Sequence, residues 1–301
     1  MPASRPLIVQ GMHGLGDNLH QRCVIRELSK KHEIWLETSW PLVYWDMPEV
    51  RLLARGTSLR TQVKNAVRSA AQFTRQAPPR GASSLQIWYR PDEVKRHGSV
   101  LAAMCSGVRV PIGDFRMPMR PEWIEKADKV LEGVTKPVMF FRPLVERREW
   151  TGCGARNPRV NDYAALFQSI RDRFHVVSVA DLEEKQEWLA SADLEADQKF
   201  HRGELDAETI FGVAHRASLI FTSPGFATVL GQALSRPTVT VFGGYEDARS
   251  FSAGAGYGPW LALEPKHPCA CWSHHHNCPK DLDVPAAQAR LGAFVEASCG
   301  M

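Results

Sequence analysis

Three scarcities in this sequence narrow what the protein can be. It has no apolar run of about 18 residues, the length that a membrane-spanning helix requires, and no charged segment followed by an apolar one at its beginning. Its seven cysteines are an odd number spread over 301 residues, a usage that does not suggest a disulfide framework. We therefore expect a cytoplasmic protein without a transmembrane segment; the sequence carries no signal of its oligomeric state.

Acidic residues are missing from one stretch of the chain. There is no Asp or Glu in residues 50–91, although the net charge of the whole chain is only +4. The basic residues of this stretch are Arg51, Arg55, Arg60, Lys64, Arg68, Arg75, Arg80 and Arg90. Arg60, Lys64 and Arg68 are four residues apart, so they share one face of a helix that we expect to run to about Gln72. Their mutual repulsion favours an anionic partner; a solvated face balanced by acids from elsewhere in the fold is the alternative.

A glycine-rich loop organises the first half of the chain. We expect a buried strand at 6–9, a loop containing Gly11, Gly14 and Gly16, and a helix at 18–31. Strand, glycine loop and helix form the first unit of an α/β nucleotide-binding domain, and glycines let the backbone approach a ligand closely. Asp17 lies where the loop becomes helix. Its carboxylate either faces a cleft as a catalytic group or caps free N–H groups of the helix.

Strands and helices alternate along both halves of the chain. In the first half we expect strands at 33–37 and 85–89 and helices at 93–105 and 122–131, and residues 133–136 read as a linker. In the second half we expect strands at 137–141, 175–179, 219–221 and 238–242, with helices at 163–173, 206–216 and 225–234. The sequence thus predicts an α/β protein with two Rossmann-like domains, residues 1–134 and 135–301, that face each other across a cleft.

A second loop, residues 221–228, joins a strand to a helix in the second half. Ser223 is expected to be the N-cap and Pro224 the first helical residue. The free N–H groups and positive end of such a helix suit a diphosphate, and ordinary capping is the alternative. Glu246, beyond the last expected strand, is placed to bond a ribose hydroxyl or is a solvated loop acid. The donor-side candidates of this loop are Thr222, Ser223, Gly225, Phe226 and Ala227.

The order of motifs in the second half resembles a known family. A capped helix, Ala-Leu-x-x-Pro at 233–237, an apolar strand, Phe-Gly at 242–243 and an acidic loop are similar to the donor half of GT-B glycosyltransferases. The likeness is strongest to the ADP-heptose:lipopolysaccharide heptosyltransferase family, whose Gly-Asp signature is resembled by residues 16–20. Residues 147–150 and the cysteine-bearing tail at 268–279 are also similar. The family's donor loop has Asp-Ser/Thr-Gly followed by a His, where this chain has Ser-Pro-Gly and no His.

The resemblance implies a GT-B fold and a nucleotide-diphosphate-sugar donor, with donor sugar and nucleotide left open. It assigns Asp17 as the general base, with His20 in the same catalytic motif, and Arg148 as a ligand of the donor. In GT-B enzymes the amino-terminal half receives the acceptor. Gly14 and Gly16 therefore fall on the acceptor side, together with Arg60, Lys64 and Arg68.

The basic stretch makes a polyanionic acceptor the expectation. Two acceptors fit: a phosphorylated lipopolysaccharide-core glycan, or DNA that carries a hydroxymethylated base, which would have to be extruded from the duplex. Trp35, Trp40, Tyr44 and Trp45 offer a stacking platform for bases, although such clusters more often pack in a core. An NAD-dependent oxidoreductase that uses the Gly11–Gly16 loop and Glu37, and a nucleic-acid-binding protein without catalysis, are the rival hypotheses.

The cysteine-bearing tail raises the question of zinc. Cys269, Cys271 and Cys278 accompany the run His274–His276. Cys-x-Cys is tighter than the usual spacing of structural zinc ligands, and the sequence shows no second ligand pair. We expect free thiols here, with zinc as the alternative. No metal, and no cofactor besides the nucleotide-sugar co-substrate, is expected.

Overall fold

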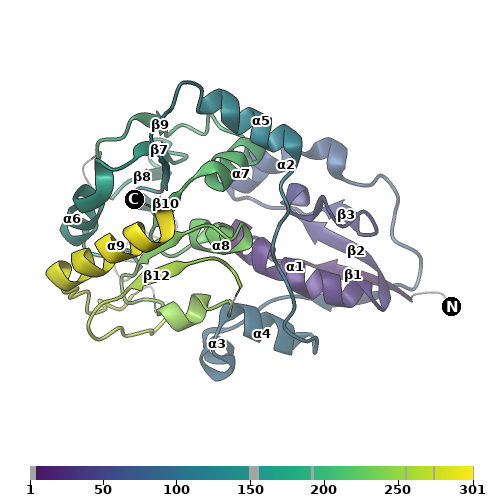
Figure 1. Ribbon diagram of the computed structural model, residues 1–301. Coiled ribbons are helices and arrows are strands. Elements are labelled where there is room, and N and C mark those ends of the chain that lie inside the picture. Colours follow the sequence, from purple (N-terminus) through teal and green to yellow (C-terminus); the bar gives the residue numbers. More distant parts are fainter. Residues whose placement is uncertain (1–4, 149–155, 191–192, 255, 274, 301) are drawn as a thin grey trace. The chain divides into compact units, whose positions relative to one another are not determined.

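Parallel β-sheets organise both halves of the chain (Figure 1). The computed structural model describes residues 5–148, 156–190, 193–254, 256–273 and 275–300. They fall into two compact units, one of residues 1–118 with 250–253 and one of residues 119–249 with 254–301. Both units are α/β, which confirms the predicted fold class. The second unit begins before residue 134, where the sequence places the domain boundary.

The first unit contains a four-stranded sheet in the order β3-β2-β1-β4, with every strand pair parallel. Its elements are β1 (Arg5–Gln10), α1 (Leu15–Ser29), β2 (His32–Thr38), the 3-10 helix η1 (Pro41–Tyr44), β3 (Arg51–Ala54), α2 (Arg60–Arg68), the 3-10 helix η2 (Ala70–Gln72), β4 (Ser83–Gln86), α3 (Pro91–His97) and α4 (Val100–Gly107). Since parallel strands end at the same edge, the residues after β1, β2, β3 and β4 gather at one edge of this sheet.

One helix predicted for the first unit is in fact two. The expected helix at 93–105 is interrupted by Gly98, which has a φ of 91° and ends α3 in the left-handed conformation. Ser99 then caps α4, because its hydroxyl accepts a hydrogen bond of 3.2 Å from the backbone N–H of Ala102. Glycine followed by serine indicates the end of one helix and the start of the next. The apolar spacing continues across this pair, so it predicted a single helix.

The second unit contains a six-stranded parallel sheet in the order β12-β11-β10-β5-β7-β9 and a small antiparallel pair, β6-β8. Its elements are α5 (Pro121–Val130), β5 (Val138–Phe141), β6 (Val145–Arg147), α6 (Val160–Arg171), β7 (His175–Val179), β8 (Glu187–Leu189), β9 (Gln198–Phe200), α7 (Ala207–Arg216), β10 (Leu219–Thr222), α8 (Phe226–Ala233), β11 (Thr238–Val241), β12 (Trp260–Leu263) and α9 (Val284–Cys299). The 3-10 helix η4 (Ala248–Phe251) is divided between the units.

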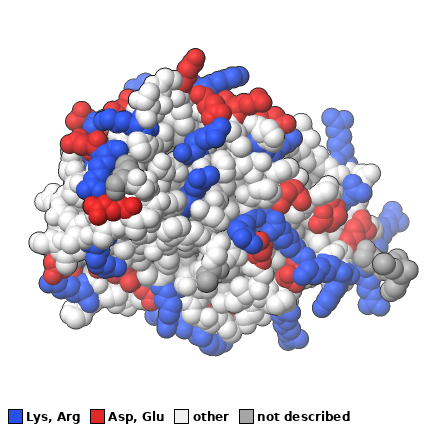
Figure 2. All heavy atoms as spheres, in the orientation of Figure 1, with Lys and Arg blue, Asp and Glu red and all other residues white. Residues whose placement is uncertain are grey.

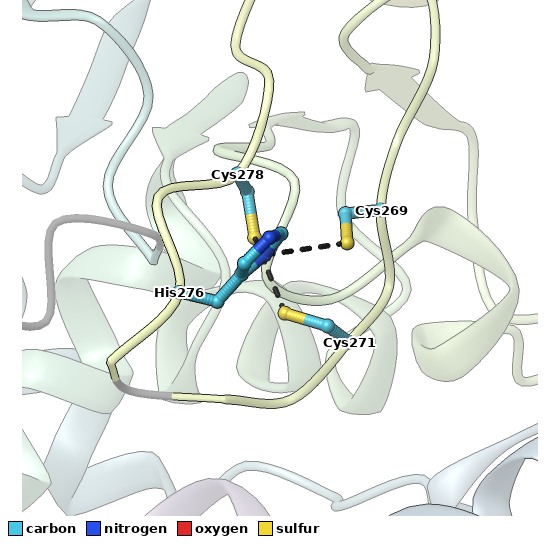
Figure 3. Close-up of side chains that lie close together, drawn as sticks. All are labelled: Cys269, Cys271, His276 and Cys278. Carbon is cyan, nitrogen blue, oxygen red and sulfur yellow. Dashed lines mark hydrogen bonds between the residues drawn. The ribbon is translucent and has the colours of Figure 1, made fainter.

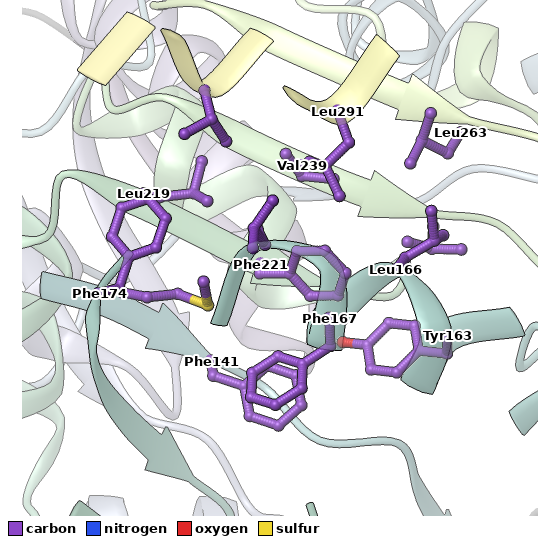
Figure 4. Close-up of a cluster of buried hydrophobic side chains, with 14 of the residues drawn as sticks. Phe141, Tyr163, Leu166, Phe167, Phe174, Leu219, Phe221, Val239, Leu263 and Leu291 are labelled. Atoms are coloured by element: carbon purple, nitrogen blue, oxygen red, sulfur yellow. The ribbon is translucent and has the colours of Figure 1, made fainter. Parts of the chain in front are cut away.

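The core of the second unit lies between the sheet and the helices α6 and α9 (Figure 4). Phe141 and Phe221 project from neighbouring strands, and the ring of Phe167 from α6 lies 4.4 Å from that of Phe141. Leu291 of α9 is fully buried in the same cluster. Burial of aromatic rings of this size contributes much of a domain's stability, so the strands that carry the site are firmly held.

Helix α5 belongs to the second unit because it packs against α7. The contact is close: a Cβ placed on Gly212 of α7 would lie 2.2 Å from the carbonyl oxygen of Trp123. Trp123 and Ala127 are buried, and Lys126 bonds the carboxylates of Asp206 and Glu208 at 2.8 and 2.6 Å. These contacts explain why the second unit begins before the linker that the sequence predicts at residues 133–136.

Charged side chains of both signs are scattered over the visible face, which is largely uncharged. Figure 2 shows acidic side chains interspersed with basic ones on this face. Within the described part of the chain, no helix combines the length and the apolar character needed to cross a bilayer.

Candidate functional site

The glycine loop of the first unit presents Asp17 at the carboxyl end of β1. Helix α1 begins at Leu15 with Gly14 as its N-cap, so Asp17 lies in the first turn, where the helix dipole favours a carboxylate. The hydroxyl of Tyr89, which follows β4, donates a hydrogen bond of 3.1 Å to Asp17 Oδ1. A Cβ placed on Gly14 would lie 2.5 Å from Asp17 Oδ2. The absent side chain of Gly14 therefore makes room for this carboxylate.

A buried network that the sequence did not suggest fixes the loop. Asn18 is fully buried, and its amide donates hydrogen bonds of 2.8 Å to the carbonyls of Met12 and Gly14. The backbone N–H of Met12 donates to Gln21 Oε1 at 2.7 Å, and Gln21 Nε2 donates to the hydroxyl of Tyr44 at 2.6 Å. Buried amides that are fully bonded hold a loop rigidly. The sequence feature that could have indicated this network is the pair of amide side chains Asn18 and Gln21, three residues apart on one face of the helix.

His20 is a core residue. Its side chain is only 2% exposed and packs edge-on against Phe115, with ring centroids 5.0 Å apart. Burial lowers its pKa to about 3, so the imidazole is neutral at ordinary pH. Burial of this imidazole in the core does not favour the catalytic role implied for His20, which stays a prediction.

Two nitrogen atoms near the carboxyl end of β3 have no hydrogen-bond partner among the described residues. They are Nδ1 of His13, in the glycine loop, and Nη1 of Arg55, directly after β3. Burial, together with the charge of Arg55, lowers the pKa of His13. Buried nitrogen atoms without partners mark a place where a polar ligand fits, and the Arg55 guanidinium is the group there that donates to an anion or a hydroxyl. Arg55 belongs to residues 50–91, the stretch without Asp or Glu. The four-residue spacing of basic residues in that stretch pointed only to the helix that follows Arg55.

Helix α2 has the position predicted for the basic helix, although it ends at Arg68 and η2 covers 70–72. Gln62 and Asn65 are buried, and the Asn65 amide donates to the carbonyl of Ser39 at 2.6 Å. Arg60, Lys64 and Arg68 each have an interaction partner within the protein. The helix and its N-cap residue Leu59 also expose large apolar side chains, at Leu59 (42%), Val63 (42%) and Val67 (72%).

Three of the four residues of the aromatic cluster at 35–45 pack in the core, and Trp45 is half-buried. Trp35, Trp40 and Tyr44 are 5% exposed or less. The indole N–H of Trp40 donates to the carbonyl of His13 at 2.9 Å, which helps to hold the glycine loop.

In the second unit, the loop after β10 differs in detail from its prediction. Helix α8 begins at Phe226 with Gly225 as the N-cap, so Ser223 and Pro224 precede the helix. Gly225 has a φ of 151°, a conformation that side chains rarely adopt and that the Ser-Pro signal did not reveal. Among the described residues no side chain caps the helix, while Thr222 Oγ1 donates a hydrogen bond of 2.8 Å to the carbonyl of Ser223. The first turn, with Phe226 and Ala227, thus keeps the positive end expected of an anion site.

Arg142 lies beside this helix start and was missed by sequence reasoning. It follows β5, the neighbour of β10, and its guanidinium lies 5.4 Å from the ring centre of Phe226. Nη1 donates to the carbonyl of Val179 at 2.7 Å, and Nη2 pairs with Glu187 at 3.3 Å. Burial lowers the pKa of Arg142, but the Glu187 carboxylate opposes this. The result is a rigid positive charge at the carboxyl edge of the sheet.

Glu246 follows β11, the other neighbour of β10, and is buried rather than solvated. Its side chain is 3% exposed, and Oε1 pairs with Arg156 at 3.3 Å. Oε2 is buried without a hydrogen-bond partner among the described residues. Burial raises the pKa of Glu246, against the pull of Arg156. An unpaired carboxylate oxygen is a good acceptor for a hydroxyl of a ligand.

Arg148 follows β6 and is exposed, with its backbone N–H donating to the carbonyl of Gln186 at 2.9 Å. Glu149 and Trp150 of the same predicted segment, and His274 of the histidine run, lie outside the described residues. The residues placed to bind a metal are Cys269, Cys271, His276 and Cys278.

Arg142, the loop at 222–227 and Glu246 thus follow three adjacent strands, β5, β10 and β11. Ligands of open parallel sheets bind at this edge.

Neither a protein-family model nor a curated protein matches the sequence. Solved structures do. The chain is similar to a glycosyl transferase family 9 structure from Veillonella parvula, with a TM-score of 0.61, 13% identity and coverage of 97% of this chain and 98% of that one. It is similar to the iron-containing dodecameric glycosyltransferase TibC of enterotoxigenic E. coli (TM-score 0.65, 14% identity, 99% and 76% covered).

It is also similar to E. coli ADP-heptose lps heptosyltransferase II, with a TM-score of 0.57, 13% identity and coverage of 97% and 99%. At these identities the likeness establishes the fold. The chain has the two-domain, GT-B-like fold of the heptosyltransferases, as its sequence motifs predicted.

Proposed function

We propose that the protein is a glycosyltransferase that moves a sugar from a nucleotide-diphosphate sugar to a hydroxyl of a polyanionic acceptor. The observation that carries this proposal is the edge of the second sheet, where a helix start, the Arg142 guanidinium and an unpaired oxygen of Glu246 follow adjacent strands. Together they offer partners for a diphosphate and a ribose. The heptosyltransferase-like fold supports the same assignment.

On the acceptor side, Asp17 acts as the general base. A sugar or base hydroxyl is a weak nucleophile, and a positioned carboxylate that takes its proton contributes about 10²–10⁴-fold to the rate. The hydroxyl oxygen forms a bond to the anomeric carbon while the bond from that carbon to the diphosphate breaks, and the proton passes to Asp17. Tyr89 and the space above Gly14 set the direction of the carboxylate.

On the donor side, the leaving nucleoside diphosphate takes the electron pair of the broken bond. The first turn of α8 supplies backbone N–H groups, and Arg142 supplies a fixed positive charge beside them. Groups that are already oriented towards developing charge stabilise a transition state effectively. Glu246 Oε2 accepts a hydrogen bond from a ribose hydroxyl, and the exposed Arg148 adds a second cation for phosphate or sugar.

The acceptor that fits best is a phosphorylated, lipid-linked glycan of the lipopolysaccharide-core type. Leu59, Val63 and Val67 form an exposed apolar stripe on α2, one residue before each member of the basic stripe at Arg60, Lys64 and Arg68. A helix that pairs an apolar stripe with a basic one suits an anionic amphiphile. Hydroxymethylated DNA remains a second acceptor to test, although burial of Trp35 and Trp40 weakens its case.

The two rival hypotheses gain nothing from the structure. Each unit has a glycine-containing loop between a strand and a helix, after β1 and after β10. A nucleic-acid-binding protein without catalysis does not need two such loops. None of the similar structures described above is an oxidoreductase.

A transfer assay tests the proposal. The purified protein is incubated with a panel of labelled nucleotide-diphosphate sugars and either phosphorylated core glycan or hydroxymethylated DNA, and the acceptor is then weighed by mass spectrometry. We expect a gain of one sugar on the glycan and release of an equal amount of nucleoside diphosphate. Failure of every donor with both acceptors, for a folded preparation, would contradict the proposal.

Arg148→Ala tests the donor side. Loss of one charge-assisted hydrogen bond should weaken nucleotide-sugar affinity about 10- to 100-fold in calorimetry, since such bonds contribute roughly 1.5–3 kcal/mol. Arg148 is exposed, so the fold should be retained. Lys185→Ala, also at an exposed position, is the matched control. Equal affinity of both variants would remove Arg148 from the donor site.

A further inference from the structure

Four ligand-type side chains meet in the segment between β12 and α9. Cys269, Cys271, His276 and Cys278 each offer one atom, and these atoms all lie within 4.8 Å of one another. Figure 3 shows the three sulfur atoms and the imidazole directed towards a common point. The sequence seemed to lack a second ligand pair. The fold supplies it by turning the chain back so that His276 and Cys278 lie opposite the Cys-x-Cys pair.

The spacing of these atoms approaches that of a tetrahedral metal site. Cys271 Sγ lies 3.2 Å from Cys278 Sγ, and His276 Nδ1 lies 3.4 Å from Cys278 Sγ and 3.5 Å from Cys269 Sγ. Zinc bonds of about 2.3 Å to sulfur and about 2.0–2.1 Å to nitrogen imply edges of roughly 3.8 Å between sulfurs and roughly 3.6 Å between sulfur and nitrogen. Small shifts of the side chains would therefore close four bonds around one ion.

The backbone around Cys271 is held in a conformation that needs support. Ala270 and Trp272, on either side of it, have φ values of 47° and 57°, in the left-handed region that is unfavourable for residues other than glycine. The backbone N–H of Ser273 donates to Cys271 Sγ at 3.4 Å. Hydrogen bonds to a ligand atom orient it for a metal, and a bound ion would in turn fix the turn that carries it.

We propose that Cys269, Cys271, His276 and Cys278 bind one Zn²⁺ ion, and that this ion clamps the loop that carries Glu246. Three thiolates and one imidazole are a ligand set for zinc. All four coordination positions are filled by the chain, which is the pattern of a structural site rather than a catalytic one.

The clamp follows from contacts between the ligand segment and the loop at 243–247. The backbone N–H groups of Ala270 and Trp272 donate to the carbonyls of Gly244 and Tyr245, at 2.9 and 3.2 Å. The rings of Tyr245 and Trp272 lie 5.6 Å apart, and Cys278 is buried against Tyr245.

Gly244, with a φ of 94°, allows close packing, because a Cβ there would lie 2.8 Å from the carbonyl oxygen of Pro279. The segment that carries the metal ligands thus packs directly against the loop that carries the buried Glu246. This part of the inference rests on the proposed role of Glu246 in the donor site.

Metal content tests the site without reference to activity. Protein prepared under reducing conditions should contain about one zinc per chain, and cobalt substituted for it should give the visible absorption of a tetrahedral thiolate site. Cys271→Ser should lose both. Cys269→His, which keeps four ligands, and Cys299→Ser, outside the cluster, should keep the metal. Absence of stoichiometric zinc, a Cys271–Cys278 disulfide found by thiol titration, or equal loss in Cys299→Ser would overturn the site.

Nucleotide affinity tests the clamp. Binding of ADP, GDP, UDP and CDP is measured before and after zinc is removed with a chelator, and the nucleotide that binds should lose about tenfold in affinity and regain it with zinc. Affinity that does not change on removal of a demonstrated ion would overturn the clamp. If zinc is present but none of the four nucleotides binds the zinc-loaded protein, the failure lies with the proposed donor site and not with the metal site.

Discussion

At the scale of single residues, Asp17 is defined by what surrounds it. Gly14 leaves space for its carboxylate, and Tyr89 bonds it from another strand end. The sequence placed Asp17 at the start of the helix, but it gave no hint of Tyr89, because a contact across 72 positions depends on strand order rather than on spacing. The same holds for the bonds that join Asn18 to Thr38 and Tyr44.

Gly14→Ala should displace the carboxylate of Asp17 while leaving the fold intact. The added Cβ would lie 2.5 Å from Asp17 Oδ2, which is the movable end of a side chain. A misplacement of about 1 Å can cost on the order of 10²-fold in rate, so we expect turnover to fall by about that factor with donor affinity unchanged. Gly56→Ala, where a Cβ meets nothing within 4 Å, is the control. Similar turnover in the two variants would argue against this role for Gly14.

His20→Leu tests whether His20 is a core residue. Its folded pKa of about 3 lies below the ordinary 6.5. Between these values the unfolded chain binds a proton that the folded protein does not, so stability falls as pH drops below about 6.5, by up to about 1.4 kcal/mol per pH unit.

His20→Leu should remove up to about 2 kcal/mol of the loss of unfolding free energy between about pH 7.5 and about pH 5, as measured by urea titration. Turnover of His20→Leu at neutral pH should match the wild type. An unchanged pH slope, or lost turnover in a folded variant, would speak against the core assignment.

At the scale of elements, local signals predicted most boundaries. β7 spans His175–Val179 as expected, and Asp206 caps α7 through a 2.8 Å hydrogen bond from the N–H of Thr209. Helix α9 was not predicted, although Ala287, Leu291 and Val295 form a buried stripe at fourfold spacing. Short strands such as β3, β6 and β9 carry too few residues for a periodic pattern, so only their pairing partners define them.

Replacing Arg60, Lys64 and Arg68 together by Gln tests the acceptor role of α2. If these residues hold phosphates, acceptor affinity falls as salt rises, and the triple variant should flatten the log–log slope by roughly three units for duplex DNA and by less for a core glycan. Donor affinity should be unchanged. The control is Lys95→Gln with Arg96→Gln on the exposed face of α3. Salt-independent binding of both acceptors, unaffected by the triple change, would reduce the basic stripe to a solubility feature.

At the scale of the whole molecule, the alternation of elements predicted two α/β units, and the resemblance of a few motifs implied their heptosyltransferase-like fold. They could not place the passage between the units, because the packing of Trp123 against α7 decides it, and that contact is remote in sequence. Nor could spacing reveal the thiol cluster, whose ligands converge only after the chain has turned back on itself.

The proposed role of Asp17 as the general base of a glycosyl transfer can be tested with the variant Asp17→Asn. The measurement compares sugar transfer to the phosphorylated glycan by the variant and the wild type, with donor affinity determined by calorimetry on the same preparations. Asn keeps the size of the side chain but cannot take the proton. We expect transfer by the variant to be reduced by about 10²–10⁴-fold with nearly unchanged donor affinity. Near-normal transfer by Asp17→Asn would contradict this role and leave Asp17 as a residue that only stabilises the start of α1.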